Sequence, residues 1–83
     1  MTKKRLIDLQ HQLRSTVGEH IRSLREQKGL NQIGLADLMN ISRSTISKIE
    51  NGKFSITLDY LAKLALYLEF EIRLVKNIKA KKE

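Results

Sequence analysis

The feature of the sequence that most constrains the fold is a link of three residues between two short predicted helices. The first helix is expected to begin after an N-cap at Asn31 and to end near Asn40, and the second begins after an N-cap at Ser42 and stops at residues 51–52. Because the link is so short, the two helices must turn sharply on each other. The centre of the chain is therefore expected to hold a compact pair of helices.

Apolar residues at helical spacing predict a helix before this pair. Val17, Ile21 and Leu24 follow one another at intervals of four and three residues, as on one face of a helix. Thr16, with Glu19 three residues later, has the pattern of a capping box. The sequence therefore predicts that this helix begins at Thr16.

Similar patterns predict helices nearer the two ends of the chain. Thr57 is the expected cap of a fourth helix, whose buried stripe includes Leu61, Leu64 and Leu68. Residues 3–14 carry apolar side chains at near-helical spacing, so they predict a short amphipathic helix that is either separate from the next one or continuous with it. The fold class is expected to be all-α, a compact bundle of four to five helices.

The segment after the last helix allows two interpretations. Phe70, Ile72 and Leu74 alternate with charged residues, which is the pattern of a β-strand. The same segment also fits a continuing helix, because no glycine or proline separates it from the preceding apolar stripe. We favour a short strand over residues 70–75. A lone strand leaves its backbone unpaired, so these three apolar residues are expected to form a dimerisation strand with a second copy of the chain. The alternative to dimerisation is that the segment packs on its own domain.

Length and composition exclude several classes of function. A chain of 83 residues is one small domain, and without cysteine it has neither disulfides nor Cys-based zinc sites. No apolar run is long enough to span a membrane and no signal peptide is recognisable, so a cytoplasmic protein without membrane attachment is expected. His11 and His20 lie outside any metal-binding or catalytic motif, and no glycine-rich phosphate loop is present. We therefore expect no enzymatic activity, no cofactor and no metal site.

The net charge of +7 lies mostly at the two ends of the chain. Residues 1–16 and residues 76–83 each carry +3, whereas residues 17–75 carry only +1. Basic ends attract any polyanion but specify none. The charge alone therefore does not identify the partner.

The polar side of the third helix is more informative than the total charge. Ile46 is expected to point into the core, whereas Arg43, Ser44, Ser47 and Lys48 lie away from that apolar stripe. A helix that enters the major groove of DNA needs Arg or Lys to reach guanine acceptors, and short hydroxyl side chains that approach base edges without steric hindrance. These residues therefore point to a DNA-reading helix in a helix-turn-helix.

Residues 42–53 give the sequence a specific resemblance to the lambda-repressor-like family of helix-turn-helix proteins, of the Cro/cI or Xre type. The resemblance extends over residues 17–68 and implies a lambda-repressor-like bundle that binds double-stranded DNA. The chain departs from the family pattern at Ile33 and Gly34, where acidic residues are usual, and at Glu69, where glycine is common.

The resemblance also implies roles for single residues. Arg25 and Glu50 match a pair that joins the first helix to the third in the family, and they are expected to form a structural ion pair. Gln32 would contact a phosphate and brace the recognition helix. The expected DNA-binding residues are Gln32, Ser42, Arg43, Ser44, Thr45, Ser47, Lys48, Asn51 and Lys53.

These expectations combine into one functional hypothesis with one alternative. The hypothesis is a sequence-specific transcriptional regulator, most simply a repressor, that binds a palindromic operator as a homodimer. The HipB-like antitoxins in the family carry a strand after the fourth helix, so the alternative is an antitoxin that binds both operator DNA and a toxin protein. The expected organisation is a helical extension at 1–15, a DNA-binding domain at 16–69, a strand at 70–75 and a basic tail at 76–83.

Overall fold

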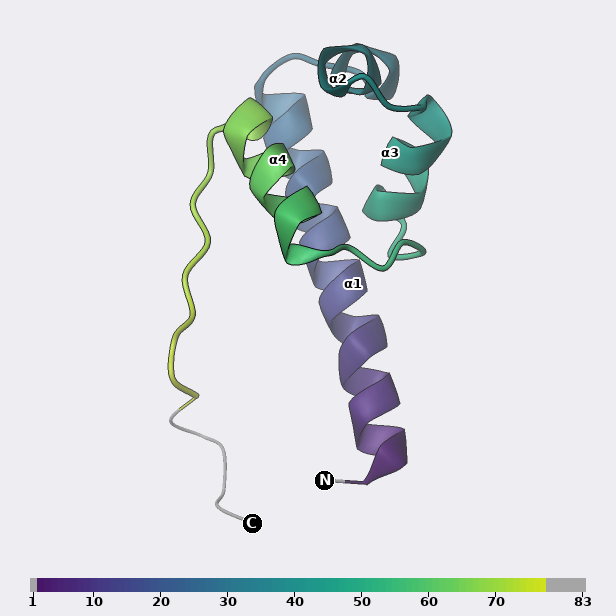
Figure 1. Ribbon diagram of the computed structural model, residues 1–83, viewed down its shortest axis with the longest axis vertical. Helices are drawn as coiled ribbons and strands as arrows, with labels where there is room; N and C mark the ends of the chain where they lie inside the picture. Colours follow the sequence, from purple (N-terminus) through teal and green to yellow (C-terminus); the bar gives the residue numbers. More distant parts are fainter. Residues whose placement is uncertain (1, 78–83) are drawn as a thin grey trace.

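The computed structural model describes residues 2–77 and folds them into four α-helices. The helices are α1 (Lys3–Gln27), α2 (Gln32–Met39), α3 (Arg43–Glu50) and α4 (Leu58–Leu68). Figure 1 shows α1 as the long axis of the molecule, with α4 beside its C-terminal half and α2 and α3 completing the globular end. The N-terminal half of α1 projects beyond this globule, which explains the elongated extents of 45 × 22 × 20 Å.

The first helix is longer than the sequence patterns indicate. Thr2 caps it by accepting a hydrogen bond from the Arg5 amide at 3.2 Å. The prediction of a cap at Thr16 is wrong, because Thr16 lies in the middle of α1. Of the two possibilities for residues 3–14, the continuous helix is the one observed, so the described residues have four helices instead of five and a single helix crosses the predicted boundary at residues 15–16.

Gly18 allows α1 and α3 to approach each other closely. It lies buried within α1, and a Cβ atom placed on it would lie only 2.9 Å from the carbonyl oxygen of Glu50 and closer still to that of Ile49. Any larger residue would therefore push α3 away from α1. The glycine lowers the helix propensity of α1 slightly, but the packing that it permits outweighs this effect.

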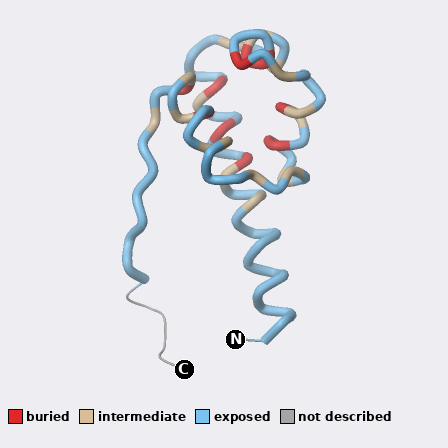
Figure 2. Tube along the Cα trace, viewed as in Figure 1, coloured by how far each residue is buried: buried red, intermediate tan, exposed pale blue. Residues whose placement is uncertain are grey.

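The core lies where the four helices meet. Ile21, Leu35, Ile46 and Leu64, one from each helix, are almost completely buried. Figure 2 shows that the buried positions cluster in the globular end, whereas the first half of α1 and the C-terminal segment are exposed. The other buried apolar residues are Ala36, Met39, Ile49 and Leu68.

The fourth helix ends at Leu68, so the alternative of a helix that continues to residue 75 is wrong. Glu69 adopts the left-handed conformation with φ of 58°, and the Phe70 amide donates to the Ala65 carbonyl at 3.2 Å, which closes the helix. Glu69 thus takes the conformation for which glycine is preferred, although its side chain disfavours it.

Residues 70–77 continue as an irregular extended segment that runs back along the molecule (Figure 1). They form neither a helix nor a β-ladder with any other part of residues 2–77. The strand over residues 70–75 therefore stays a prediction about a state with a pairing partner. Most of the predicted basic tail, residues 78–83, lies outside the described residues. Over residues 2–77, no helix is long and apolar enough to cross a membrane.

Candidate nucleic-acid interface

The turn between α2 and α3 is built from backbone geometry at a single residue. Asn40 adopts the left-handed conformation, with φ of 56° and ψ of 48°, and Asn is one of the few residues that tolerates it. The Ile41 amide then donates to the Ala36 carbonyl at 3.0 Å and closes α2. This turn sets α3 against α2, so that Met39 of α2 and Ile46 of α3 both lie buried in the core.

The first turn of α3 presents polar groups to the surface. Ser42 caps the helix by accepting from the Thr45 amide at 3.1 Å, and the hydroxyls of Ser42 and Thr45 lie 2.8 Å apart in a hydrogen bond. Arg43 and Ser44 are exposed beside them. Amides in the first turn of a helix lack intrahelical acceptors, so this end of α3 can donate hydrogen bonds to a phosphate or to a base edge.

A buried ion pair connects α1 to α3. The Arg25 Nε donates to the Glu50 Oε2 at 2.6 Å and its Nη2 to the Oε1 at 3.0 Å, and both side chains are almost fully buried. The remaining guanidinium nitrogen, Nη1, donates to the Leu30 carbonyl at 2.7 Å. The hydrogen bond from Arg25 to Glu50 raises the pKa of Arg25, while burial opposes the shift. The structure therefore brings together the two residues expected to form the structural pair.

Gln32 extends this pair to the surface of α3. Its Nε2 donates to the Glu50 Oε1 at 3.1 Å, and its Oε1 accepts from the Arg43 Nη1 at 3.0 Å. Because Glu50 is a carboxylate paired with Arg25, it can only accept, and this fixes the amide nitrogen of Gln32 inward and the oxygen outward. The outward oxygen holds the exposed Arg43 guanidinium. A chain of hydrogen bonds thus connects the buried pair to the side chain at the start of α3.

The other end of α3 is held by shorter-range contacts. The Asn51 side chain donates to the Ser47 hydroxyl at 3.4 Å, and the Lys53 amide donates to the Lys48 carbonyl at 2.8 Å. Lys48, Asn51 and Lys53 are exposed and Ser47 is half-buried. The predicted DNA-binding residues therefore follow one surface, from the start of α2 along α3 to the loop after it.

A hollow at the start of α2 adds a residue that the sequence analysis missed. Its volume is about 430 Å³. Arg22 is exposed at its edge, where its Nε lies 4.0 Å from a carboxylate oxygen of Glu26. Arg22 precedes Arg25 by three residues and so lies on the same side of α1, which is the signal that could have identified it. The hollow is lined by Arg22, Arg25, Asn31, Gln32, Ile33 and Arg43.

The three residues predicted to mediate dimerisation lie away from this surface. Phe70 is half-buried and packs against the core, Ile72 is 45% exposed and Leu74 is 99% exposed. Within residues 2–77 they lie in no β-ladder, although the Phe70 amide donates to the Ala65 carbonyl at the end of α4. Within residues 2–77, no three His, Asp or Glu side chains gather in a group that could hold a metal ion.

Known proteins that are similar to this chain include a phage repressor and a controller protein. The immunity repressor protein of Bacillus phage phi105 is 33% identical over 57 residues, which cover 69% of this chain and 40% of the repressor. The solved structure of the restriction-modification controller protein C.AhdI from Aeromonas hydrophila superposes with a TM-score of 0.64 at 37% identity, over 69% of this chain and 86% of that one. The chain thus spans less than half the length of the repressor and most of the controller protein.

A family model described as helix-turn-helix matches residues 21–75, which include all of α2, α3 and α4. The matched region contains the turn at Asn40, the cap at Ser42 and the pair of Arg25 with Glu50. The chain therefore belongs to the helix-turn-helix family of DNA-binding regulators of the Cro/cI and Xre type.

Proposed function

We propose that this protein is a cytoplasmic repressor that binds a two-fold symmetric DNA operator as a homodimer. The observation that carries the proposal is the chain of hydrogen bonds from the buried Arg25–Glu50 pair through Gln32 to Arg43. It holds an exposed guanidinium at the start of α3 before DNA is present. A base-reading side chain that is already ordered loses less conformational entropy when it binds.

Each part of the surface has a distinct task in this proposal. Arg43 and Lys48 read guanine acceptors in the major groove, with the hydroxyls of Ser44, Thr45 and Ser47 against base edges or phosphates. On either side of α3, other residues contact the phosphate backbone and set the position of the helix without reading sequence. These phosphate-binding groups are the side chains of Arg22, Ser42, Asn51 and Lys53 and the backbone amide of Gln32, which has no intrahelical acceptor at the start of α2.

Two features support a regulator that binds DNA as a dimer. The similar proteins described above are named as a repressor and as a controller protein. In addition, helix-turn-helix dimers read half-sites about 34–36 Å apart, which is one turn of DNA. The apolar alternation of Phe70, Ile72 and Leu74 offers a means of joining two copies.

Selection of bound sites from random duplexes at a stated salt concentration tests the proposal. We expect a two-fold symmetric motif. Protein that shows no preference for any selected or promoter duplex over scrambled DNA would contradict sequence-specific binding. Deletion of residues 70–83 is expected to give a monomer in sedimentation, and a persisting dimer would place the interface elsewhere.

Two matched variants separate base reading from phosphate binding. Arg43→Ala is expected to weaken binding to the selected site by about 1–3 kcal/mol and to relax the preference at one base pair. Lys53→Ala is expected to weaken binding to selected and random duplexes alike. Equal losses on both duplexes for Arg43→Ala would show that Arg43 contacts phosphate and not a base.

The antitoxin alternative adds a toxin partner to the same DNA-binding role. It predicts a gene for a kinase-like or nuclease-like protein beside the gene for this chain, and a stable complex of the two purified proteins. No contact within the described residues favours it over the simpler regulator.

A further inference from the structure

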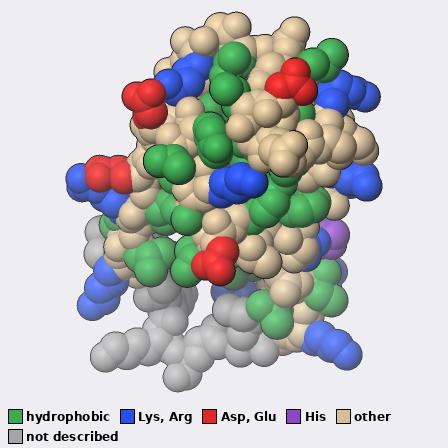
Figure 3. Space-filling view, turned by 45° about the horizontal axis from the view of Figure 1, so that its top comes forward, with side chains coloured by type: hydrophobic (Ala, Val, Ile, Leu, Met, Phe, Trp, Pro, Cys, Tyr) green, Lys and Arg blue, Asp and Glu red, His purple; other side chains and the backbone are tan. Residues whose placement is uncertain are grey.

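One apolar face of α1 is covered by its own chain over only half of its length. Val17 and Leu24 pack against the core from this face. Leu6, Leu9 and Leu13 continue the same face towards the N-terminus, at intervals of three and four residues, and are 47%, 39% and 53% exposed. We call these three leucines the α1 stripe. Figure 3 also shows hydrophobic side chains exposed between basic ones on one face of the molecule.

A second apolar surface follows the end of α4. Phe70 packs against the core, whereas Leu74 and Val75 are 99% and 85% exposed. In the described chain the backbone of this extended segment lies in no β-ladder. Exposed aliphatic side chains on an unpaired extended backbone are a site for association with another chain.

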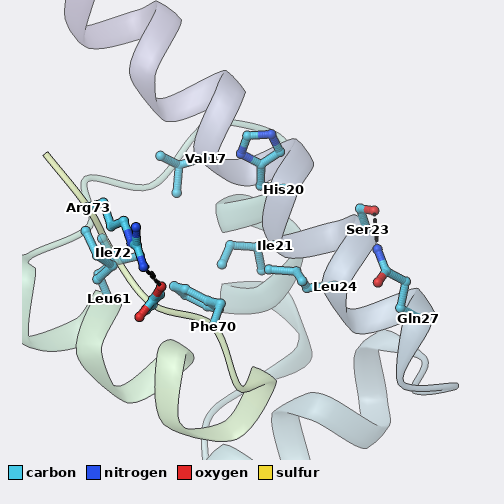
Figure 4. Close-up of a pocket in the computed structure, with 11 residues that line it drawn as sticks. Val17, His20, Ile21, Ser23, Leu24, Gln27, Leu61, Phe70, Ile72 and Arg73 are labelled. Atoms are coloured by element: carbon cyan, nitrogen blue, oxygen red, sulfur yellow. Dashed lines mark hydrogen bonds and ion pairs between the residues drawn. The ribbon is translucent and has the colours of Figure 1, made fainter. Parts of the chain in front are cut away.

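A groove lies between these two surfaces. It has a volume of about 450 Å³, and Figure 4 shows Val17, Leu24, Leu61, Phe70 and Ile72 around it. A second groove shares Val17 and Leu61 with the first and extends along α1 past Leu13 and Gln10, where Ile56 is also at its edge. The apolar lining therefore continues from the core onto the α1 stripe.

The uncovered parts of α1 and of the C-terminal segment lie at the same end of the molecule. The segment runs antiparallel to α1 (Figure 1). An extended chain advances about 3.3 Å per residue and a helix about 1.5 Å. Since Phe70 and Ile72 line the groove beside Val17 and Leu24, the two residues Leu74 and Val75 come level with the exposed half of α1.

We propose that a second copy of this chain covers both surfaces at once. Residues 70–75 of the two copies pair as an antiparallel ribbon, and the apolar side of the ribbon lies on the α1 stripe of both copies. This inference rests on the homodimer of the proposed function and adds the first half of α1 to its interface. A two-stranded ribbon is marginal alone and needs an apolar surface beneath it, and the α1 stripe supplies that surface.

The size and symmetry of the face fit this occupant. The stripe, the two grooves and the segment to Val75 together comprise about 20 residues, which is the lower end of the roughly 20–30 that each partner contributes to a standard stable interface. Each copy offers both a helix stripe and a strand, so the face is self-complementary about a two-fold axis.

Sedimentation of the full chain without DNA tests the inference. Leu9→Gln/Leu13→Gln keeps good helix formers in α1 but removes the apolar stripe, and we expect it to raise the dimer dissociation constant at least about 100-fold. The matched control is His11→Gln/Ser15→Gln, which places the same residue at the same spacing on the opposite, exposed side of α1. It is expected to leave the dissociation constant within about threefold.

A thiol probe keeps the stripe intact and does not depend on how the leucine variant folds. The chain has no cysteine, so Gln10→Cys, at the edge of the second groove, carries the only thiol. Its reaction with a thiol reagent is expected to slow as the protein concentration rises, while that of His11→Cys stays constant.

The possible results separate this inference from the proposed function. A leucine variant that dimerises like the wild type, or a Gln10→Cys thiol that reacts at one rate at all concentrations, would overturn the α1 interface and leave the ribbon and DNA binding intact. A wild-type chain that stays monomeric would overturn both the inference and the proposed homodimer. Loss of DNA preference in the selection experiment, with the dimer retained, would count against the proposed function only.

Discussion

At the residue scale, the buried Glu50 carboxylate is the group that connects α1, α2 and α3 beneath the candidate DNA-binding surface. It accepts from Arg25 twice and from Gln32 once, and its side chain is only 2% exposed. Glu50→Gln would leave the buried guanidinium without a counter-charge. We expect a loss of about 3–5 kcal/mol in the free energy of unfolding, measured by chemical denaturation.

Glu26→Gln is the matched control for that prediction. It makes the same substitution in an ion pair of Arg22 with Glu26, whose side chains are about 60% exposed. An exposed pair contributes about 0–1 kcal/mol, so this variant should unfold almost like the wild type. Equal stabilities of the two variants would mean that burial of the Arg25–Glu50 pair does not determine its contribution.

Gly18 leads to a second prediction at this scale. A Cβ atom at this position meets the backbone carbonyls of Ile49 and Glu50, which cannot rotate away as a flexible side chain could. Gly18→Ala is therefore expected to destabilise the fold by about 3 kcal/mol, even though alanine is the better helix former. The neighbouring exposed Glu19→Ala is expected to stay within about 0.5 kcal/mol in the same denaturation series, and equal effects would exclude a steric cause.

The resemblance to the family implied some of these contacts and did not indicate others. The match of Arg25 and Glu50 to a family pair indicated that they meet, and Gln32 was expected to brace α3. The closeness of Gly18 to α3 and the position of Arg22 at the hollow depend on how α1 crosses α2 and α3, and no local pattern encodes that crossing.

At the element scale, the start of a helix was easier to predict where a capping residue follows residues that are not helical. Asn31, Ser42 and Thr57 all cap the helices predicted for them. Thr16 failed as a cap, because a capping box marks a helix start only if the preceding residues are not themselves helical. Residues 3–15 are helical and carry no proline, so the pattern at Thr16 is simply part of α1.

The end of α4 gives a prediction at this scale. Glu69→Gly is expected to raise the temperature of thermal unfolding by a few degrees, because glycine adopts the left-handed conformation without strain. Asn40→Gly is the control, and its gain should be smaller because Asn tolerates this conformation better than Glu. A lower unfolding temperature for Glu69→Gly would mean that the ion pair of Lys28 with Glu69 outweighs the backbone strain.

The same residue predicts a pH dependence. The hydrogen bond from the Lys28 Nζ to the Glu69 Oε1, at 2.5 Å, lowers the pKa of Glu69 below its ordinary value of 4.5. The stabilisation of the fold by this ion pair is fully present above pH 4.5 and disappears as the pH falls through the lowered pKa of Glu69 in the folded state. The difference in unfolding temperature between the wild type and Glu69→Gln should therefore be small near neutral pH and vanish only as the pH falls through the lowered pKa of Glu69, which lies below 4.5. A difference that grows in acid would contradict this ion pair.

At the scale of the whole molecule, the fold could be predicted and the assembly could only be hypothesised. The helix-turn-helix pair and the all-α fold followed from spacing and caps, since both are set by local chemistry. The extended conformation of residues 70–77 and the exposure of the α1 stripe are both properties of a single copy of the chain. Whether residues 70–75 become a strand depends on a second backbone that the local sequence does not contain.

The distribution of charge over the molecule gives the last prediction. The C-terminal tail carries four lysines, Lys76, Lys79, Lys81 and Lys82, whereas the residues expected to read bases lie on α3. Replacing all four lysines by Gln keeps the length of the chain and lowers its net charge from +7 to +3. Lysines outside the base-reading helix attract phosphates of any sequence, so affinity for the selected duplex and for random duplex should fall by the same factor.

The salt dependence of binding measures how many phosphates these lysines neutralise. The logarithm of the binding constant should depend less steeply on the logarithm of the salt concentration, by about 0.9 for each phosphate that the variant no longer neutralises. Titrations at several salt concentrations give both the affinity and this slope, and Arg43→Ala, which should change the ratio of the two affinities, is the control. A changed ratio for the lysine variant would mean that the tail itself reads sequence. Unchanged affinity and salt dependence would mean that α3 and its flanking residues neutralise the DNA backbone without the tail.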